Sequence, residues 1–176
     1  MENITVKRKE FKYFINYTDY LVLVDILKNH LIQDKNAIKN NGFIRSLYFE
    51  GIFNETFEEK QDGVLNRKKY RLRIYNLDSE NAKFEIKKKY NDQILKESVT
   101  ITKEDAKEIQ NCNYEVMLKY KNKALNEIYC EFKKKIYRPV VVVEYEREAF
   151  NFPMNSIRIT FDKNLRANSE DLDIFS

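Results

Sequence analysis

The sequence predicts an α+β fold in which an antiparallel β-barrel is covered on its outside by helices. About eight segments alternate apolar and charged residues with the period of two that is typical of strands. Between them lie stretches in which apolar residues recur at helical spacing. No internal repeat, linker or low-complexity tract interrupts the sequence, so a single domain is expected over residues 1–176.

The first third of the chain is expected to hold a strand, a helix and a second strand. Residues 4–15 (ITVKRKEFKYFI) alternate as a strand does. Thr18 is expected to cap an amphipathic helix that continues through residues 19–31. Residues 43–49 (FIRSLYF) form the second predicted strand, and the acidic stretch 53–65 is expected to be a short helix followed by a loop.

The remainder of the chain is expected to be mostly strands. The turn-forming residues 76–81 (NLDSEN) join two of them into a hairpin. Thr102 and Asp105 resemble a capping box that opens a helix, and a longer helical pattern covers residues 114–135. The strands are predicted at residues 68–75, 82–90, 94–101, 138–150 and 156–162.

Charged residues collect on one face of these strands. In YRLRIY, for example, Arg71 and Arg73 alternate with apolar residues. If helices cover a barrel, the apolar face packs outward against them and the charged face lines the interior. That interior must then hold water or an anionic ligand, because each unpaired buried charge costs several kcal/mol. The charged face comprises Arg8, Glu10, Lys12, Lys69, Arg71, Arg73, Glu85, Lys87, Lys89, Tyr145, Arg147, Arg158, Thr160 and Asp162.

A half-exposed sheet with its cations in solvent is the usual explanation for one such strand. The repetition over several strands, with arginine at many of the positions, favours a ligand instead. The planar guanidinium group suits bidentate contacts to phosphate. Carboxylates among the cations are what a divalent metal beside a polyphosphate would need. The residues alone therefore predict a basic tunnel or groove for a phosphate-rich ligand.

Composition excludes several other classes of protein. A hydrophobic content of 43% excludes a disordered chain. Only three glycines are present, which argues against a glycine-rich phosphate loop. Cys112 and Cys130 are too few for a disulfide framework and have no catalytic partner, and His30, the only histidine, is expected to be incidental on a surface helix. The N-terminus is no signal peptide and no apolar run reaches the length of a membrane span, so a cytoplasmic location is expected.

Several short motifs, in order, resemble the VTC domain. This domain is the polyphosphate polymerase module of the vacuolar transporter chaperone family, within the triphosphate tunnel metalloenzymes. The resemblance covers residues 8–168, and the combination of EYEREAF with IRITFD is its most specific part. The motifs are RKEFKY, RSLYFE, YRLRIY, FEIKKK, RPVVVVEYEREAF and IRITFDKNLR.

The resemblance implies roles for particular residues. The catalytic cations that hold the triphosphate and the growing chain would be Lys12, Arg71, Arg73, Lys87, Arg147 and Arg158. Further substrate contacts would come from Arg8, Lys89, Lys96 and Tyr145. Glu10 and Glu85 stand where tunnel carboxylates occur, and would help to hold Mg²⁺ or Mn²⁺. Arg8 replaces the first glutamate of the ExExK strand found in the adenylate-cyclase and thiamine-triphosphatase branch, which favours the polymerase branch.

The resemblance implies a metal-dependent phosphotransferase that transfers the γ-phosphoryl group of ATP to a polyphosphate chain. Family members usually continue into a final strand that carries a metal-binding glutamate, and no such strand follows DKNLR, so the barrel is expected to be incomplete at its C-terminal end. A non-catalytic polyphosphate-binding or regulatory subunit stays open for that reason, and an inorganic triphosphatase is a further alternative. A membrane-protein partner that holds the chain at the inner face of a membrane is a further expectation.

A nucleic-acid-binding barrel ranks below these readings. Twelve tyrosines and many lysines could supply stacking and phosphate contacts, but the tyrosines scatter over both strand faces. Among the cations, Arg73 is expected to serve function rather than stability. Its removal from a crowd of like charges should leave the unliganded protein at least as stable as before.

Overall fold

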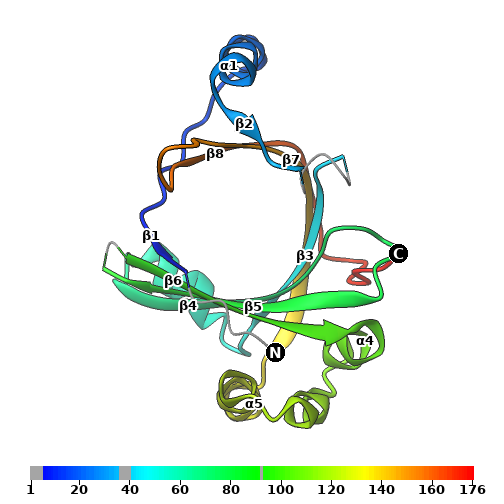
Figure 1. The fold of residues 1–176 in the computed structure, drawn as a ribbon. Helices are drawn as coiled ribbons and strands as arrows, with labels where there is room; N and C mark the ends of the chain where they lie inside the picture. The colour runs from blue at the N-terminus through cyan, green and yellow to red at the C-terminus, as the bar shows by residue number, and fades with distance from the viewer. Residues whose placement is uncertain (1–5, 36–40, 92) are drawn as a thin grey trace. The chain divides into compact units, whose positions relative to one another are not determined.

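The computed structural model of the protein describes residues 6–35, 41–91 and 93–176 (Figure 1). The described strands pair in the order β1-β6-β5-β4-β3-β7-β2, and β8 pairs with β7. The predicted fold class, α+β with an antiparallel sheet and helices packed on it, is confirmed. The elements are β1 (Val6–Arg8), α1 (Tyr17–His30), β2 (Ile32–Gln33), β3 (Phe43–Glu50), α3 (Glu55–Gln61), β4 (Asn66–Ile74), β5 (Asn81–Tyr90), β6 (Gln93–Thr102), α4 (Lys103–Gln110), the 3-10 helix η1 (Tyr114–Tyr120), α5 (Lys123–Lys135), β7 (Arg138–Asn151) and β8 (Arg158–Asn168).

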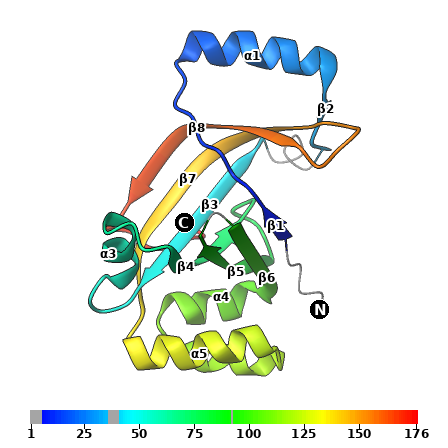
Figure 2. The same cartoon turned by 90° about the vertical axis from the view of Figure 1, so that its left-hand side faces the viewer.

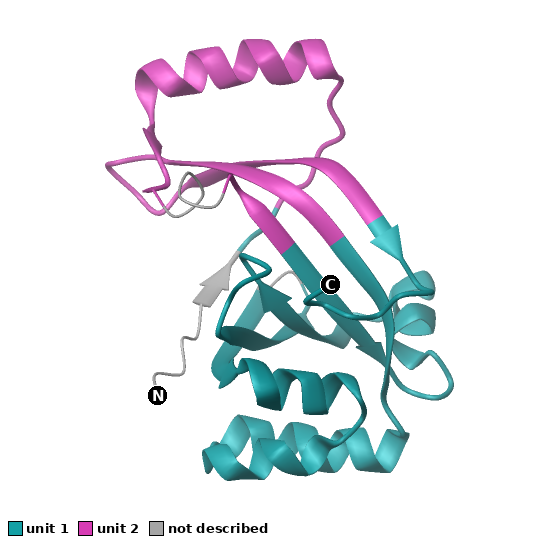
Figure 3. Ribbon diagram, turned by 90° about the vertical axis from the view of Figure 1, so that its right-hand side faces the viewer, with its two compact units in different colours: residues 1–10, 45–143, 167–176 teal, residues 11–44, 144–166 magenta. Residues whose placement is uncertain are grey.

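The chain divides into two compact units, coloured separately in Figure 3. Unit 1 consists of residues 1–10, 45–143 and 167–176, and unit 2 of residues 11–44 and 144–166. The boundaries fall within β3, β7 and β8, so each of these strands runs from one unit into the other.

Unit 1 is built on the antiparallel strands β3 to β6. The predicted hairpin is β4 and β5, with Leu72 directly opposite Phe84, and β6 continues the meander. The helices α4 and α5 cover one face of these strands, as Figures 1 and 2 both show. Leu72 and Phe84 share a face of the sheet. Phe132 of α5 packs there, with its ring centroid 5.9 Å from that of Phe84 and 5.1 Å from that of Tyr70. Because this face forms the core, the opposite face must carry the charged residues.

The helices of unit 1 differ in part from the prediction. Thr102 caps α4 as expected, since its Oγ1 accepts a hydrogen bond from the backbone N–H of Asp105 at 3.2 Å. The single helix predicted over 114–135 is wrong, because η1 ends and α5 begins anew. Lys121 takes the left-handed conformation, with φ of 48°, which stops the first helix. Asn122 then caps α5 by accepting from the N–H groups of Ala124 and Leu125.

Unit 2 contains α1 and parts of the long strands. The predicted strand over 4–15 is too long, because β1 ends at Arg8. Residues 11–15 are all exposed, so no buried face holds them in a ladder. Asn16, not Thr18, caps α1, and its Oδ1 accepts from the N–H of Asp19 at 2.8 Å. The core of this unit gathers Val24, Phe150 and Phe161.

No helix among the described residues is long and apolar enough to cross a membrane.

Candidate functional site

The charged face of unit 1 brings together residues from four strands. Arg71 of β4 lies directly opposite Glu85 of β5, and Glu85 lies opposite Ser98 of β6. One rung further along the strands, Lys87 lies opposite both Lys69 and Lys96. Since residues two apart in a strand share a face, the hairpin register alone collects these cations around Glu85.

The carboxylate of Glu85 is the centre of this group. The Nε and Nη2 atoms of Arg71 lie 2.7 Å and 2.6 Å from its Oε2. The Nε atom of Arg73 lies 3.8 Å from the same oxygen, and Nζ of Lys96 lies 2.5 Å from Oε1. We refer to Arg71, Arg73, Glu85 and Lys96 as the Glu85 cluster. Three cations surround one carboxylate, so the cluster carries an excess of two positive charges.

Two polar side chains of β3 complete the cluster from the other side. The Nη1 atom of Arg71 donates a hydrogen bond to the hydroxyl of Tyr48 at 3.1 Å, and Nε of Arg73 donates to Oγ of Ser46 at 3.2 Å. Ser46 is completely buried. Neither residue was predicted as part of the site. Their place on one face of FIRSLYFE, two residues apart, is the sequence signal that would have indicated them.

The burial of the cluster distinguishes it from an ordinary solvated strand face. Glu85 and Arg73 are only 1% and 4% exposed. Burial would raise the pKa of the Glu85 carboxyl, but Arg71, Arg73 and Lys96 outweigh it and lower that pKa to about 2. For Lys96, burial together with the two arginines outweighs the attraction of Glu85 and lowers the pKa of its ammonium group to about 8. Glu85 is therefore ionised at neutral pH, and Lys96 titrates close to that range.

The burial of Arg73 gives it a structural role that the sequence did not indicate. Its guanidinium group also lies 6.0 Å from the ring centroid of Tyr75. A buried arginine that contacts Glu85, Ser46 and an aromatic ring contributes packing and hydrogen bonds to the folded state. The expectation that its loss costs no stability is therefore replaced by the expectation of a loss.

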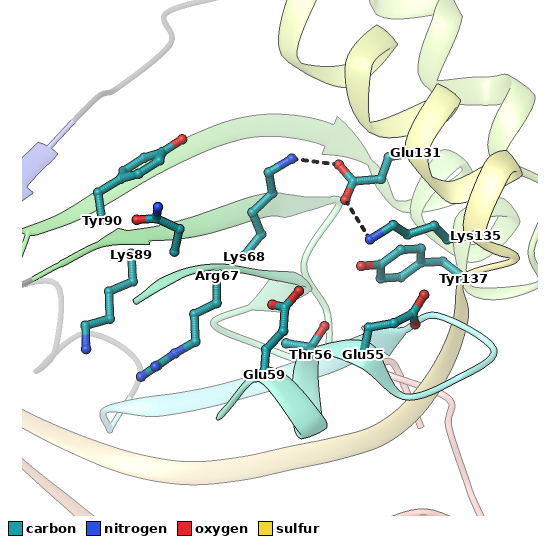
Figure 4. Close-up of a pocket in the computed structure, with 11 residues that line it drawn as sticks. Glu55, Thr56, Glu59, Arg67, Lys68, Lys89, Tyr90, Glu131, Lys135 and Tyr137 are labelled. Atoms are coloured by element: carbon teal, nitrogen blue, oxygen red, sulfur yellow. Dashed lines mark hydrogen bonds and ion pairs between the residues drawn. The ribbon is translucent and has the colours of Figure 1, made fainter. Parts of the chain in front are cut away.

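The other predicted residues of unit 1 are Arg8, Glu10, Lys87 and Lys89. Lys87 forms an ion pair with Glu10. Lys89 lies opposite Arg67, and both line a cavity of about 170 Å³ at the other end of the hairpin (Figure 4). The side chain of Arg8 lies outside the described part of the chain, although its backbone pairs with Ile94.

The cavity has mixed charge. The Nζ atom of Lys68 lies 2.9 Å from Oε2 of Glu131 on α5, and Nζ of Lys135 lies 4.0 Å from Oε1 of the same residue. The hydroxyl of Tyr70 also donates to Glu131, at 2.7 Å. These contacts tie β4 to α5, and they account for the charges at this end of the cavity without a ligand.

Four predicted residues lie in unit 2, where two arginines meet separate carboxylates. Arg147 makes two contacts of 2.6 Å to Asp162, and its guanidinium lies 5.2 Å from the ring centroid of Tyr145. Arg158 lies 2.7 Å from Asp34. Both arginines thus have specific acidic partners. That they serve the same ligand as the Glu85 cluster stays a prediction, as does a role for the exposed Lys12.

The predicted metal ligands do not fit a divalent cation in this arrangement. Both oxygens of Glu85 face cationic groups, and Glu10 is paired with Lys87. A divalent ion at Glu85 would add two positive charges to a cluster that already has an excess of them. Within residues 6–35, 41–91 and 93–176, no group of three or more His, Cys, Asp and Glu side chains is placed to hold a metal.

The match to a family model agrees with the motifs. The family model of the VTC domain matches residues 7–175. Among solved structures, a candidate adenylate cyclase from Bacillus halodurans is similar to this chain at 13% sequence identity and a TM-score of 0.48. That similarity covers 92% of this chain and 80% of the other. No curated protein sequence matches. The family match confirms the resemblance that the sequence motifs indicated.

Proposed function

The chain belongs to the VTC domain family, whose function is polyphosphate-related or triphosphate-binding, and we propose that it extends polyphosphate chains from ATP. The observation that carries this proposal is the Glu85 cluster, with its excess of two positive charges on a buried strand face. An anion bound at this cluster would be favoured, because like charges held together in a low dielectric repel strongly. A triphosphate supplies several negative charges and many acceptor oxygens at once.

Phosphoryl transfer requires that the reacting groups are positioned and that the developing negative charge is stabilised. The terminal phosphate oxygen of the acceptor chain forms a bond to the γ-phosphorus, and the bond from that phosphorus to the β–γ bridging oxygen breaks. The nucleoside diphosphate leaves with the electron pair of the broken bond. Arg71 and Lys96 would donate hydrogen bonds to the phosphoryl oxygens as charge builds on them. The attacking phosphate is already anionic, so no protein base is required.

No catalytic step is assigned to a metal held by Glu10 and Glu85. The family resemblance nevertheless implies Mg²⁺ or Mn²⁺, so both ions belong in any assay of the chain. A cytoplasmic location, expected from the sequence, and attachment to a membrane-protein partner, implied by the resemblance, both stay proposals.

The test is an incubation with γ-labelled ATP, a short polyphosphate primer and Mg²⁺ or Mn²⁺, followed by separation of the products by length. Labelled chains longer than the primer, together with ADP, are expected. Arg71→Ala should abolish them. Lys88→Ala, which removes a cation from the same hairpin on the opposite face, should not. Release of labelled inorganic phosphate alone would identify a triphosphatase, and tight polyphosphate binding without turnover would identify a binding subunit.

A further inference from the structure

Glu85 is a buried carboxylate at the centre of the cations that are proposed to bind phosphate. It projects from the central strand of the β4–β5–β6 meander, between Arg71 on one side and Ser98 on the other. Its side chain is 1% exposed, so water contributes little to its solvation. The cations around it provide the solvation that it has lost.

The contacts of Glu85 are those that a phosphate group would make. Arg71 approaches a single oxygen, Oε2, with both Nε and Nη2, and guanidinium N–H groups donate to carboxylate and phosphate oxygens alike. Lys96 approaches the other oxygen. One carboxylate thus engages three cations, and a bound phosphate would compete for the same donors.

We infer that Glu85 is a built-in counter-anion of the phosphate site, which orders Arg71, Arg73 and Lys96 in the empty protein and weakens phosphate binding. This inference rests on the proposed phosphate-binding function. The carboxylate stabilises the unliganded fold because it separates cations that would otherwise repel. It also repels an incoming phosphate, so a polyphosphate chain is held less tightly than the cations alone would hold it. For a site along which a chain must advance, weaker binding permits release.

The test compares Glu85→Gln with Glu97→Gln. Glu85→Gln removes a fully buried carboxylate from β5. Glu97→Gln removes a partly buried carboxylate from the neighbouring strand β6. Glu97 pairs with Lys88 on the opposite face of the same sheet, so it is the matched control. Thermal unfolding without ligand and calorimetric titration with tripolyphosphate, both in the presence of a chelator, are measured for each variant and the parent.

Glu85→Gln is expected to melt about 6–12 °C below the parent, because the three cations then lose the buried carboxylate that they share. It should bind tripolyphosphate about tenfold more tightly, because a negative charge close to the ligand has gone. Glu97→Gln should leave the affinity for tripolyphosphate within about threefold of the parent, since the two faces of the sheet are separated by the backbone.

Three results would overturn the inference. Weaker binding by Glu85→Gln in chelator would mean that the carboxylate is needed to form the site. Unchanged binding in chelator with weaker binding in Mn²⁺ would make Glu85 a metal ligand. Unchanged thermal stability would remove the counter-anion role. If the parent itself fails to bind tripolyphosphate, the proposed function is wrong. If the parent binds and Glu85→Gln binds less tightly, only the inference about Glu85 is wrong.

A second variant covers the case in which Glu85→Gln does not fold. The double substitution Glu85→Gln with Lys96→Gln restores the excess charge of the parent cluster, since one anion and one cation are removed together. It should fold and melt above the single variant. A double variant that is no more stable than the single one would contradict the counter-anion role.

Discussion

Cations meet carboxylates in both units of the chain, but with different consequences. In unit 1, Arg71, Arg73 and Lys96 share one carboxylate that is 1% exposed, and positive charge is left over. In unit 2, Arg147 and Arg158 have separate acids, Asp162 and Asp34, and the side chains of the Arg147–Asp162 pair are 23% and 41% exposed. The first arrangement keeps an excess of positive charge in a low dielectric, which favours the binding of an anion. In the second arrangement the charges of each pair balance and are screened by water. The presence of an ion pair therefore indicates little about function. The burial of the charged groups and their net charge indicate more.

The pH dependence of stability should separate the two arrangements most clearly. The pKa of Glu85 is about 2 in the folded protein against an ordinary value of 4.5. The stabilisation is fully present above pH 4.5 and is lost as the pH falls through the folded pKa. We expect this carboxylate to account for about 3 kcal/mol of the acid-induced loss.

Urea unfolding of the parent and Glu85→Gln between pH 6 and pH 2 measures this contribution. The difference in unfolding free energy between the two should shrink as the pH falls, because protonation removes the same charge that the substitution removes. A difference that stays constant over this range would mean that the Glu85 carboxylate has no depressed pKa.

Removal of Arg73 should have the next largest effect. Arg73→Ala deletes a buried side chain and its hydrogen bond to Ser46, so a loss of about 2 kcal/mol of unfolding free energy is expected. Arg67→Ala, on the same strand and face but less buried, is the control and should cost much less. Equal losses from the two substitutions, measured by urea unfolding at neutral pH, would contradict the structural role assigned to Arg73.

Removal of an acid in unit 2 should have the smallest effect. Asp162→Asn breaks the Arg147 pair, yet solvent-exposed pairs contribute little, so less than about 1 kcal/mol is expected. The same urea experiment in low and high salt measures it. A loss as large as that from Glu85→Gln would show that the two arrangements do not differ in the way described.

The alternation of charged and apolar residues was enough to predict the strands and their charged face. It placed Arg71 and Arg73 on one face of their strand and Glu85 on the charged face of the next, because the period of a strand is fixed by the backbone. The exact register was not predictable in the same way. The alternation requires only that Arg71 and Glu85 share a face, and which residue lies opposite Arg71 depends on how residues 75–80 turn.

The remaining differences come from local competition that composition does not resolve. Asn16 and Thr18 are both good helix caps, and the first of them caps α1. Asn122 interrupts an apolar stripe that otherwise continues from η1 into α5. The metal assignment of Glu10 and Glu85 followed from the resemblance, and the pairing of both with cations could be seen only once the strands were placed side by side.

The affinity of Arg71→Ala for tripolyphosphate tests the central claim, that the Glu85 cluster binds phosphate, most directly. Arg71 is less buried than Arg73, the other arginine of the cluster, and it contacts Glu85 through two nitrogen atoms. Calorimetry in the presence of chelator should show a loss of about ten- to hundredfold relative to the parent, as expected for one charge-assisted contact to phosphate. Lys88→Ala should bind tripolyphosphate as the parent does. An unchanged affinity for Arg71→Ala, or an equal loss for Lys88→Ala, would contradict the claim.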